Sequence, residues 1–395
     1  MCAGFTHADF RRFFLFSCDP PEKIELKSDI ILDENMTIIN STPIKDGFRM
    51  PGEFEKHAGC WMAWPERCDL WYDQARPAQK SYAQVAAAIA RFEPVTMCVL
   101  KKDKETARNM LPASIRILEM EYDDAWMRDI GPTFVTNGKE IRGVHWNFNS
   151  WGGFLPSWEK DKQVGQKILE TEQMDGYKQD MVLEGGSIHT DGDGTLITTE
   201  ECLLHPTRNP QLSKQEIEES LKNYLNVQKI IWLPKGVYMD DVNGHVDNLC
   251  CFIKPGVIAL AWTDDKKDPQ YKISLEAFEI LRNSTDAKGR TFEIHKIHLP
   301  KPLFTTVEEC ASLESIQGKK LTEPGKRLTA SYINFYPAST GVVIPSFGDS
   351  FFDQKAQSDI QELFPERKVV AVPARNIVLG GGGIHCITLQ QPSIR

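Results

Sequence analysis

Apolar positions between residues 213 and 225 repeat with the period of an α-helix. Ser213 stands before this run and Glu216 follows three residues later, a pair typical of a capping box at a helix start. The pattern predicts a surface helix with one apolar side, formed by Ile217, Leu221, Tyr224 and Leu225. An apolar strand at residues 229–234 is expected to follow this helix, and after it a polar loop.

A second pattern, two β-rich runs around a short turn, occurs in five segments. Three of the turns are read directly from the sequence, at Asn137-Gly138, within Asp191–Gly194 and at Lys254-Pro255-Gly256. Residues 331–347 and 380–392 show a similar alternation of β-rich runs and turn residues, which brings the number of such segments to five. Helix, strand and hairpin together therefore form one predicted structural unit.

Two of these segments are copies of one motif. "VLEGGSIHT" at 182–190 and "VLGGGGIHC" at 378–386 agree at six of nine positions. Corresponding points of the five segments are marked by Asp129, Glu184, His245, Asn334 and Cys386, with spacings of 55, 61, 89 and 52 residues. Such a period predicts a closed ring of ββαβ-like units, with the polar residue at the start of each hairpin facing the central axis. An ordinary α/β sheet with incidental hairpins is the alternative.

Composition narrows the class of protein. The 395 residues allow two or three domains or one large domain built from repeats. A hydrophobic fraction of 41% and a charged fraction of 26% are ordinary for a globular protein, and no apolar run approaches the roughly 20 residues of a membrane span. The net charge of −9 argues against a nucleic-acid partner and is compatible with a cationic ligand. We expect neither nucleic acid nor membrane as a partner.

The ten cysteines contain no C-x-x-C pair, so neither a zinc site nor a dense disulfide framework is expected. Reduced thiols and a cytoplasmic location fit this distribution. Residues 1–45 lack the long apolar stretch of a signal peptide and are interpreted as an N-terminal extension, a candidate for disorder. Residues 46–395 are interpreted as a single catalytic domain.

Cys386 is a candidate nucleophile because it follows four glycines, which permit unusual dihedral angles and close approach of backbone amides to a ligand. A buried core cysteine is the alternative. If "NGHVDN" were a strand, His245 and Asp247 would project from the same face. A cysteine with a nearby histidine and carboxylates is a set suited to covalent catalysis.

Two further carboxylates stand at unusual places. Asp129 follows Arg128 and precedes a Gly-Pro turn, and Glu184 precedes two glycines in an otherwise apolar run. An Arg-Asp pair that holds the turn is the structural alternative for Asp129. Carboxylates from three segments around a cysteine and a histidine would enclose a planar cation. A guanidinium group is the natural candidate, because its fork of N–H donors matches carboxylate geometry.

Eight ordered motifs carry a resemblance to a known family: "MPGEFEKHAGCWMAWPER", "DDAWMRDIGPTF", "WNFNSWGG", "LEGGSIH", "TEECLLHPTRNP", "NGHVDNLCCF", "SYINFY" and "GGGGIHCITLQQP". Together they resemble the agmatine deiminases, within the bacterial-type peptidylarginine deiminase family of guanidine-modifying enzymes. The resemblance runs from about Met50 to Pro392. It implies an α/β fold, a five-bladed pseudosymmetric α/β-propeller, together with a homodimer and no metal or organic cofactor.

The resemblance also implies residue roles. Cys386 would be the nucleophile and His245 the general acid and base. The substrate guanidinium would be held by Asp129 and Asp247 with support from Glu184, and the pocket would include Trp126, Gly382 and, for the amine end, Asp241. Asp240 is the alternative to Asp241. The chain departs from the family where relatives usually have Asn at the position of Gly383, and where "YPASTG" replaces a more usual Asn-Gly turn.

The implied reaction is hydrolysis of agmatine to N-carbamoylputrescine and ammonia through a thiouronium intermediate, as part of polyamine (putrescine) biosynthesis. The alternatives are deimination of free or peptidyl arginine, transfer of the amidino group to a second amine, and non-catalytic binding of an arginine-like cation. Either the bound cation or a protonated His245 could generate the thiolate, and the sequence leaves both routes open.

Overall fold

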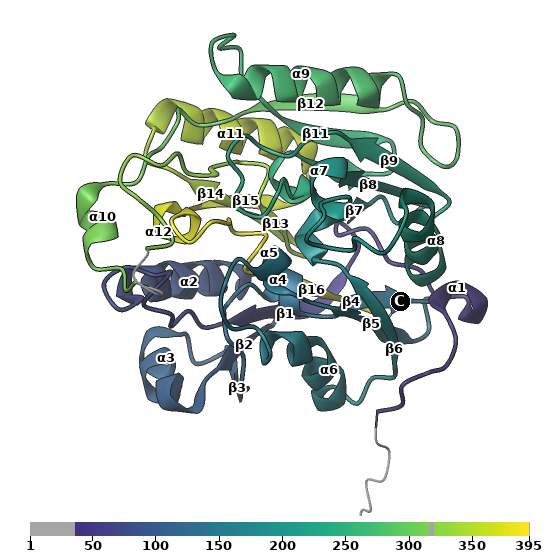
Figure 1. Ribbon diagram of the computed structural model, residues 1–395, viewed down its shortest axis with the longest axis horizontal. Helices are drawn as coiled ribbons and strands as arrows, with labels where there is room; N and C mark the ends of the chain where they lie inside the picture. Colours follow the sequence, from purple (N-terminus) through teal and green to yellow (C-terminus); the bar gives the residue numbers. More distant parts are fainter. Residues whose placement is uncertain (1–35, 316–319, 395) are drawn as a thin grey trace, which may run out of the picture. The chain divides into compact units, whose positions relative to one another are not determined.

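The computed structural model describes residues 36–315 and 320–394 of the 395 (Figure 1). Residues 36–395 form one compact unit. Of the predicted N-terminal extension, residues 1–35 lie outside the described part of the chain. Residues 36–45 are described and include a backbone hydrogen bond of 2.8 Å from Ile39 N to Gly176 O. The domain boundary at residue 46 stays a prediction.

The described strands form five separate sheets, none of which closes on itself. One sheet has four strands: β16 (Leu389–Pro392), β1 (His57–Ala63), β2 (Val95–Val99) and β3 (Arg116–Glu119). Four sheets have three strands each: β4 (Thr133–Thr136), β5 (Ile141–Asn147) and β6 (Gly176–Val182); β7 (Ile188–Thr190), β8 (Thr195–Thr199) and β9 (Lys229–Leu233); β10 (Cys250–Lys254), β11 (Val257–Trp262) and β12 (Glu293–His298); β13 (Tyr336–Pro337), β14 (Gly341–Ser346) and β15 (Lys368–Pro373).

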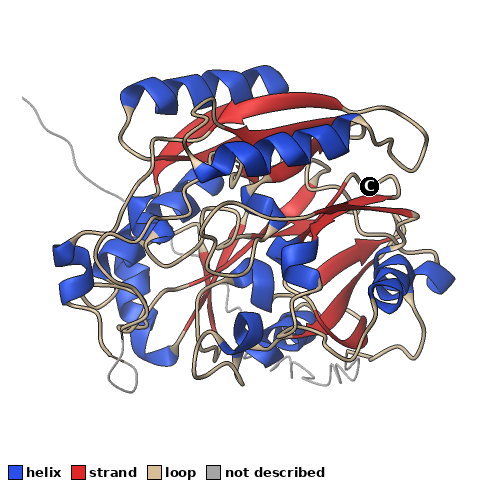
Figure 2. Cartoon of the chain, turned by 45° about the horizontal axis from the view of Figure 1, so that its top comes forward, coloured by secondary structure: helices blue, strands red, loops and turns tan. Residues whose placement is uncertain are grey.

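All five sheets share one plan. The first two strands of each sheet are antiparallel, and the next is parallel and is reached through a helix. The crossover helices are α2 (Arg76–Ile89), α6 (Asp161–Thr171), α8 (Lys214–Leu225), α9 (Pro269–Arg282) and α11 (Ser350–Leu363). Figure 2 shows helices lying alongside the strands. The predicted ββαβ unit is therefore present five times in a mixed α/β fold.

The other described helices are short and lie within or between these units. They are α1 (Pro43–Asp46), α3 (Lys104–Met110), α4 (Met127–Ile130), α5 (Ser150–Gly153), α7 (Glu200–Leu203), α10 (Val307–Ala311) and α12 (Arg375–Val378), with 3₁₀ turns η1 (Lys101–Asp103), η2 (Gly185–Ser187) and η3 (Val246–Asn248). Within the described residues, no helix combines the length and apolar character needed to cross a membrane.

The capping-box helix is confirmed as α8. Ser213 is its N-cap, and both reciprocal hydrogen bonds with Glu216 are present. Ile217, Leu221 and Leu225 are buried, each worth about 1.5–3 kcal/mol of apolar burial. The three hairpin turns read from the sequence also join β4 to β5, β7 to β8 and β10 to β11.

The prediction of a hairpin in residues 380–392 is wrong. The last strand, β16, pairs antiparallel with β1 at the other end of the described chain, with Trp61 opposite Leu389. A local hairpin requires two strands adjacent in sequence, whereas here residues 384–388 form no strand. Pairing of β16 with β1 closes the first ββαβ unit and fixes the segment that carries Cys386.

Candidate active site

The five marker residues converge in one region. Each lies in the segment that leads into the first strand of one sheet: Asp129 in α4, Glu184 before η2, His245 before η3, Asn334 before β13 and Cys386 before β16. All five side chains are buried. The common plan of the sheets therefore delivers one polar side chain from each unit to the same place, as the spacing predicted.

Gly186 is the point at which three polar groups of the site meet. A Cβ atom added there would lie 2.6 Å from Nδ1 of His245, 2.9 Å from Oδ2 of Asp247 and 3.1 Å from Oδ1 of Asp129. The backbone N–H of Gly186 also donates a hydrogen bond of 2.9 Å to Asp129 Oδ1. A residue without a side chain is thus required at the centre of the cluster.

Asp129 is held at both carboxylate oxygens. Oδ1 accepts the Gly186 bond, and Oδ2 accepts a bond of 3.0 Å from Nε1 of Trp151. Burial raises the pKa of Asp129 above its usual value, and the neighbouring charge of Asp247 acts in the same direction. A cation placed against Asp129 would oppose both effects, because its positive charge stabilises the ionised carboxylate.

His245 stands between carboxylates. Its Nδ1 is 4.0 Å from Asp129 Oδ1, and its Nε2 is 3.9 Å from Glu184 Oε2. Burial lowers the pKa of His245, but the carboxylates of Asp129, Asp247 and Glu184 outweigh it and leave the pKa raised. The imidazole is therefore disposed to carry a proton and donate it.

The strand geometry predicted for His245 and Asp247 is wrong. His245 caps η3, and Asp247 lies inside this 3₁₀ turn rather than on a strand. Residues two apart do not share a face in a 3₁₀ turn. The two side chains still approach the same point near Gly186, because the chain turns around it.

Cys386 lies against Asp247 and Asn334. Its Sγ is 3.4 Å from Asp247 Oδ2 and 3.3 Å from Asn334 Nδ2, and only 5% of the residue is exposed. Burial, followed by the charges of Asp247 and Asp129, raises the pKa of the Cys386 thiol well above its usual value. These surroundings favour the protonated thiol over the thiolate.

A pocket opens beside Cys386. Its lining consists of Leu70, Trp126, Asp129, Trp151, Phe154, Leu155, Asp241, Val242, His245, Asn248, Gly380, Gly381, Gly382 and Cys386. Six of the eight predicted site residues belong to this lining, whereas Glu184 and Asp247 do not. A Cβ on Gly382 would lie 2.6 Å from the Trp126 ring and 3.1 Å from Cys386 Sγ, so this glycine keeps the thiol accessible.

Glu184 is tied to Arg208 rather than to the pocket. The guanidinium Nε of Arg208 donates a hydrogen bond of 2.7 Å to Glu184 Oε1, and both side chains are fully buried. Oε2 is left beside His245 and accepts a weak bond from the Cys202 thiol at 3.7 Å. Glu184 is therefore placed to influence His245, not to contact a ligand in the pocket.

The two neighbouring aspartates have different surroundings. Asp240 Oδ2 accepts the backbone N–H of His245 at 2.8 Å, and burial raises the pKa of Asp240 to about 7. Asp241 lines the pocket and forms an ion pair with Lys326. Of the two alternatives, Asp241 is the carboxylate at the pocket.

A family model of Porphyromonas-type peptidyl-arginine deiminases matches residues 49–392. The chain belongs to this family. A Listeria monocytogenes protein is 58% identical over 363 residues, which cover 90% of this chain and 100% of that protein. The agmatine deiminase of Pseudomonas fluorescens is 52% identical over 365 residues, 91% of this chain and 99% of that protein.

Solved structures agree with this assignment. The agmatine deiminase of Enterococcus faecalis matches with a TM-score of 0.88 at 44% identity, covering 91% of this chain and 100% of that chain. The resemblance found in the sequence is thereby confirmed, and with it the prediction of an enzyme of the deiminase family. The predicted homodimer stays a prediction.

Several site residues of this deiminase-family chain were not predicted. They are Trp151, which binds Asp129; Arg208, which binds Glu184; Asn334 as a contact of Cys386; and the pair Glu53 and His385. Trp151 and Arg208 lie within the motifs quoted above, but no local sequence pattern indicates which side chains they contact in the fold. The repeated histidine of "SIHT" and "GIHC" was the available signal for His385.

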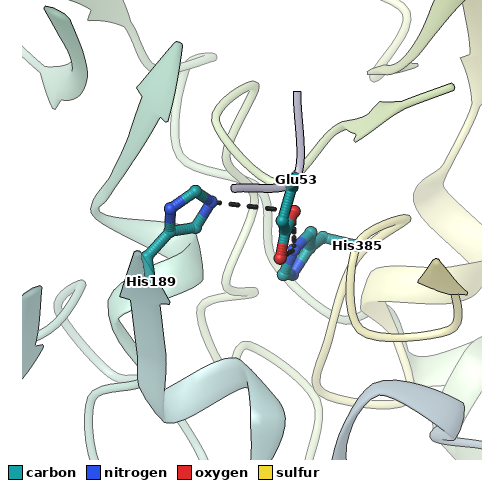
Figure 3. A group of neighbouring side chains, drawn as sticks. All are labelled: Glu53, His189 and His385. Atoms are coloured by element: carbon teal, nitrogen blue, oxygen red, sulfur yellow. Dashed lines mark hydrogen bonds and ion pairs between the residues drawn. The ribbon is translucent and has the colours of Figure 1, made fainter. Parts of the chain in front are cut away.

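Glu53, His189 and His385 have potential ligand atoms within 4.8 Å of one another (Figure 3). Nη1 of Arg128 also lies 3.0 Å from Glu53, and His385 directs Nε2 to Glu53 at 2.8 Å. A cation beside the carboxylate and a ring nitrogen already engaged with it are features of an ion-pair network rather than of a metal site.

Gly383, where relatives usually have Asn, lies directly against the side chain of Asn334. A Cβ at this position would lie 2.3 Å from Oδ1 of Asn334, the side chain that contacts Cys386. Any larger residue at 383 requires Asn334 to move. Glycine therefore keeps the Asn334 amide against the thiol in this chain.

Proposed function

We propose that the protein hydrolyses agmatine to N-carbamoylputrescine and ammonia through a covalent adduct on Cys386. The observation that carries the proposal is the convergence of His245 and the carboxylates of Asp129 and Asp247 around Gly186, with the Cys386 thiol against Asp247. Family membership and relatives named agmatine deiminases support the same reaction.

We expect a guanidinium bound at Cys386 to engage two carboxylates. Asp129 lines the pocket, and Asp247, which is outside the lining, lies against Cys386, which is part of it. Among the described residues no group hydrogen-bonds to Oδ1 of Asp247. A buried acceptor without a partner is costly, and an N–H donor of the substrate would satisfy it. The indole rings of Trp126 and Trp151 provide apolar walls suited to a flat cation.

Binding of the cation would also activate the nucleophile. Part of the rise in the pKa of Cys386 comes from the charges of Asp247 and Asp129, after the larger effect of burial. A guanidinium between these carboxylates opposes that part, and the protonated His245 adds a second positive charge. We therefore favour a thiolate that forms when the substrate is bound.

The Cys386 thiol loses its proton to solvent, and the thiolate sulfur then attacks the central guanidinium carbon to form a tetrahedral adduct. His245 donates its proton to one nitrogen, which leaves as ammonia, and the C–S bond of an S-alkylthiouronium remains. The neutral His245 next accepts a proton from water, whose oxygen attacks the same carbon. Cleavage of the C–S bond, with transfer of the hydroxyl proton to the departing sulfur, releases N-carbamoylputrescine and restores the Cys386 thiol.

Asp241 is the proposed partner of the substrate ammonium group. In the structure it pairs with Lys326, so agmatine would have to displace that ammonium or share the carboxylate with it. The presence of Lys326 beside Asp241 also favours free arginine as a second candidate substrate, because the Lys326 ammonium could pair with the α-carboxylate of arginine. Asp241→Asn should raise KM for agmatine more than it lowers kcat, whereas Lys326→Met should lower KM for agmatine and raise KM for arginine.

The test is ammonia release by the purified protein with agmatine, free arginine and a blocked arginyl peptide in parallel. We expect release from agmatine, with arginine and the peptide far slower. A preference for arginine or the peptide would overturn the substrate assignment and redirect attention to Lys326. Release of putrescine, in place of ammonia, together with a guanidinylated acceptor amine would support amidino transfer instead.

We also propose that the five ββαβ units are blades of a pseudosymmetric propeller around the site. The shared strand plan and the arrival of one polar residue from each unit support it. A place in polyamine biosynthesis is proposed from the product, since hydrolytic loss of its carbamoyl group would leave putrescine.

A further inference from the structure

The repeated motif places its two histidines at one carboxylate. His189 and His385 occupy the same position in the two copies, and both reach Glu53 (Figure 3). His385 Nε2 lies 2.8 and 2.9 Å from the two Glu53 oxygens, and His189 Nε2 lies 3.7 Å from one of them. All three side chains are buried, and the proposed reaction uses none of them.

The two histidines differ in what their second nitrogen meets. Nδ1 of His189 accepts the backbone N–H of Phe252 at 3.3 Å, so the His189 proton resides on Nε2. Nδ1 of His385 instead lies 2.9 Å from Asp247 Oδ2. An ionised carboxylate only accepts hydrogen bonds, so His385, facing two of them, must donate from both nitrogens and is an imidazolium.

The surrounding charges agree with this protonation state. Burial and the Arg128 guanidinium lower the pKa of His385, but Glu53 and Asp247 outweigh them and leave the pKa raised. Burial raises the pKa of Asp247, but the hydrogen bond and charge of His385, with the charge of His245, leave it lowered. Arg128 and His385 thus balance the negative charges of Glu53 and Asp247.

The contacts of Asp247 also fix its orientation. Oδ2 accepts from His385 Nδ1 and lies 3.4 Å from Cys386 Sγ, whereas no described residue bonds to Oδ1. Glu53 is itself fixed by Arg128 and by a bond of 2.8 Å between its backbone oxygen and His57 Nε2. A chain of contacts therefore runs from the β1 end of the fold to the proposed guanidinium acceptor.

We propose that Glu53 and His385 are positioning residues: Glu53 holds His385 as an imidazolium, and this imidazolium holds Asp247 ionised with one oxygen free for the substrate. The proposal rests on the proposed function, since it assigns Asp247 to the substrate guanidinium. His189 supports only Glu53. The charged or titratable groups that face this chain of contacts are Arg128, His189, His245, Asp129 and the Cys386 thiol.

The first experiment measures protonation and needs no turnover. The ring nitrogens of ¹⁵N-histidine-labelled protein are observed by NMR from pH 6 to 9, and His385 is assigned by the signal lost in His385→Asn. We expect both His385 nitrogens to be protonated at pH 7 in the wild type, and His385 to lose its proton at a lower pH in Glu53→Gln than in the wild type. A neutral His385 at pH 7 in the wild type would overturn the proposal.

The second experiment separates charge from geometry through kinetics. In His385→Asn the amide nitrogen can replace Nδ1 as donor to Asp247 without its charge, and in His385→Gln the amide reaches toward Glu53 only. Loss of an opposite charge at this distance raises a carboxyl pKa by about 1–3 units. We expect kcat/KM for agmatine in His385→Asn, relative to wild type, to be lower at pH 5.5 than at pH 8, by up to about tenfold.

His385→Gln should instead lose kcat/KM at both pH values, because Asp247 loses its donor. The matched control is His189→Asn, which leaves the contacts of Asp247 intact and should follow the wild-type pH profile. A pH-independent ratio for His385→Asn, in a protein with wild-type circular dichroism, would show a merely structural role and overturn the charge assignment.

Failure of the proposed function gives a different pattern. A wild-type protein that releases no ammonia from agmatine would contradict the deiminase proposal, whereas the NMR titration of His385 would still decide its protonation state. If His385 is an imidazolium but the protein is inactive, the assigned protonation state is correct. The positioning role would still be wrong, because there would be no reaction for Asp247 to serve.

Discussion

Replacement of Asp247 by asparagine should change thiol reactivity and turnover in opposite directions. His385 Nδ1 donates to Oδ2, so the amide oxygen of the substituted side chain would take that place and its NH₂ group would take the place of Oδ1. An N–H donor would then face the substrate guanidinium, which has only donors of its own. Affinity and rate should both fall.

The size of the effect on the thiol follows from the distance. Oδ2 lies 3.4 Å from Cys386 Sγ, which gives a repulsion of about 1.2 kcal/mol with a water-like dielectric constant and about 5 kcal/mol with an effective value near 20. These energies correspond to about one to three and a half pKa units. The thiolate population at pH 8 should thus rise at least about tenfold in Asp247→Asn.

The assay is alkylation by iodoacetamide at pH 8, followed by mass spectrometry of the tryptic peptide 376–395. This peptide contains Cys386 as its single cysteine. Cys68, which is partly exposed and does not line the pocket, serves as an internal control for general reagent access. We expect faster alkylation of Cys386 in Asp247→Asn, an unchanged rate at Cys68 and a large loss of ammonia release.

An equal or slower alkylation of Cys386 in the variant would refute the reasoning, because Asp247 would then not raise the pKa of the thiol. A wild-type kcat/KM in the same variant would remove Asp247 from the substrate site.

Three further predictions follow from the geometry. Gly186→Ala places a Cβ 2.6–3.1 Å from three polar atoms of the site and should lower kcat/KM about 100-fold with a normal circular dichroism spectrum; near-normal turnover would contradict the convergence. Gly383→Ala should displace the Asn334 amide from Cys386 and lower kcat about tenfold; a crystal structure of the variant with Asn334 unmoved would refute the cause. Because burial raises the pKa of Asp240 to about 7, folding favours its protonated form, so wild-type stability should decrease as the pH rises from about 4 to 7, more steeply than that of Asp240→Asn; parallel Tm profiles would exclude this contribution.

Elements with strong local signals were predictable from the sequence. The helix after Ser213 carries its own cap and apolar side, and the turn at Asn137-Gly138 specifies a hairpin wherever the strands lie. The regular spacing of Asp129, Glu184 and Cys386 also indicated their convergence, because each unit repeats one strand plan.

Contacts between segments far apart in the sequence could not be predicted from such local signals. Glu53 and His385 are 332 residues apart in sequence, and the pairing of β16 with β1 brings their segments together. The same pairing explains the false hairpin at the C-terminal end, since a strand has the same sequence pattern whichever partner it pairs with. The 3₁₀ turn at His245 was missed because three residues are too few for a period to be recognised.

The most direct test of the central claim is ammonia release from agmatine by Cys386→Ala, with binding of agmatine measured on the same sample by calorimetry. The Cys386 nucleophile predicts that the variant binds agmatine and releases no ammonia above the uncatalysed rate. Release near the wild-type rate would contradict covalent catalysis by Cys386.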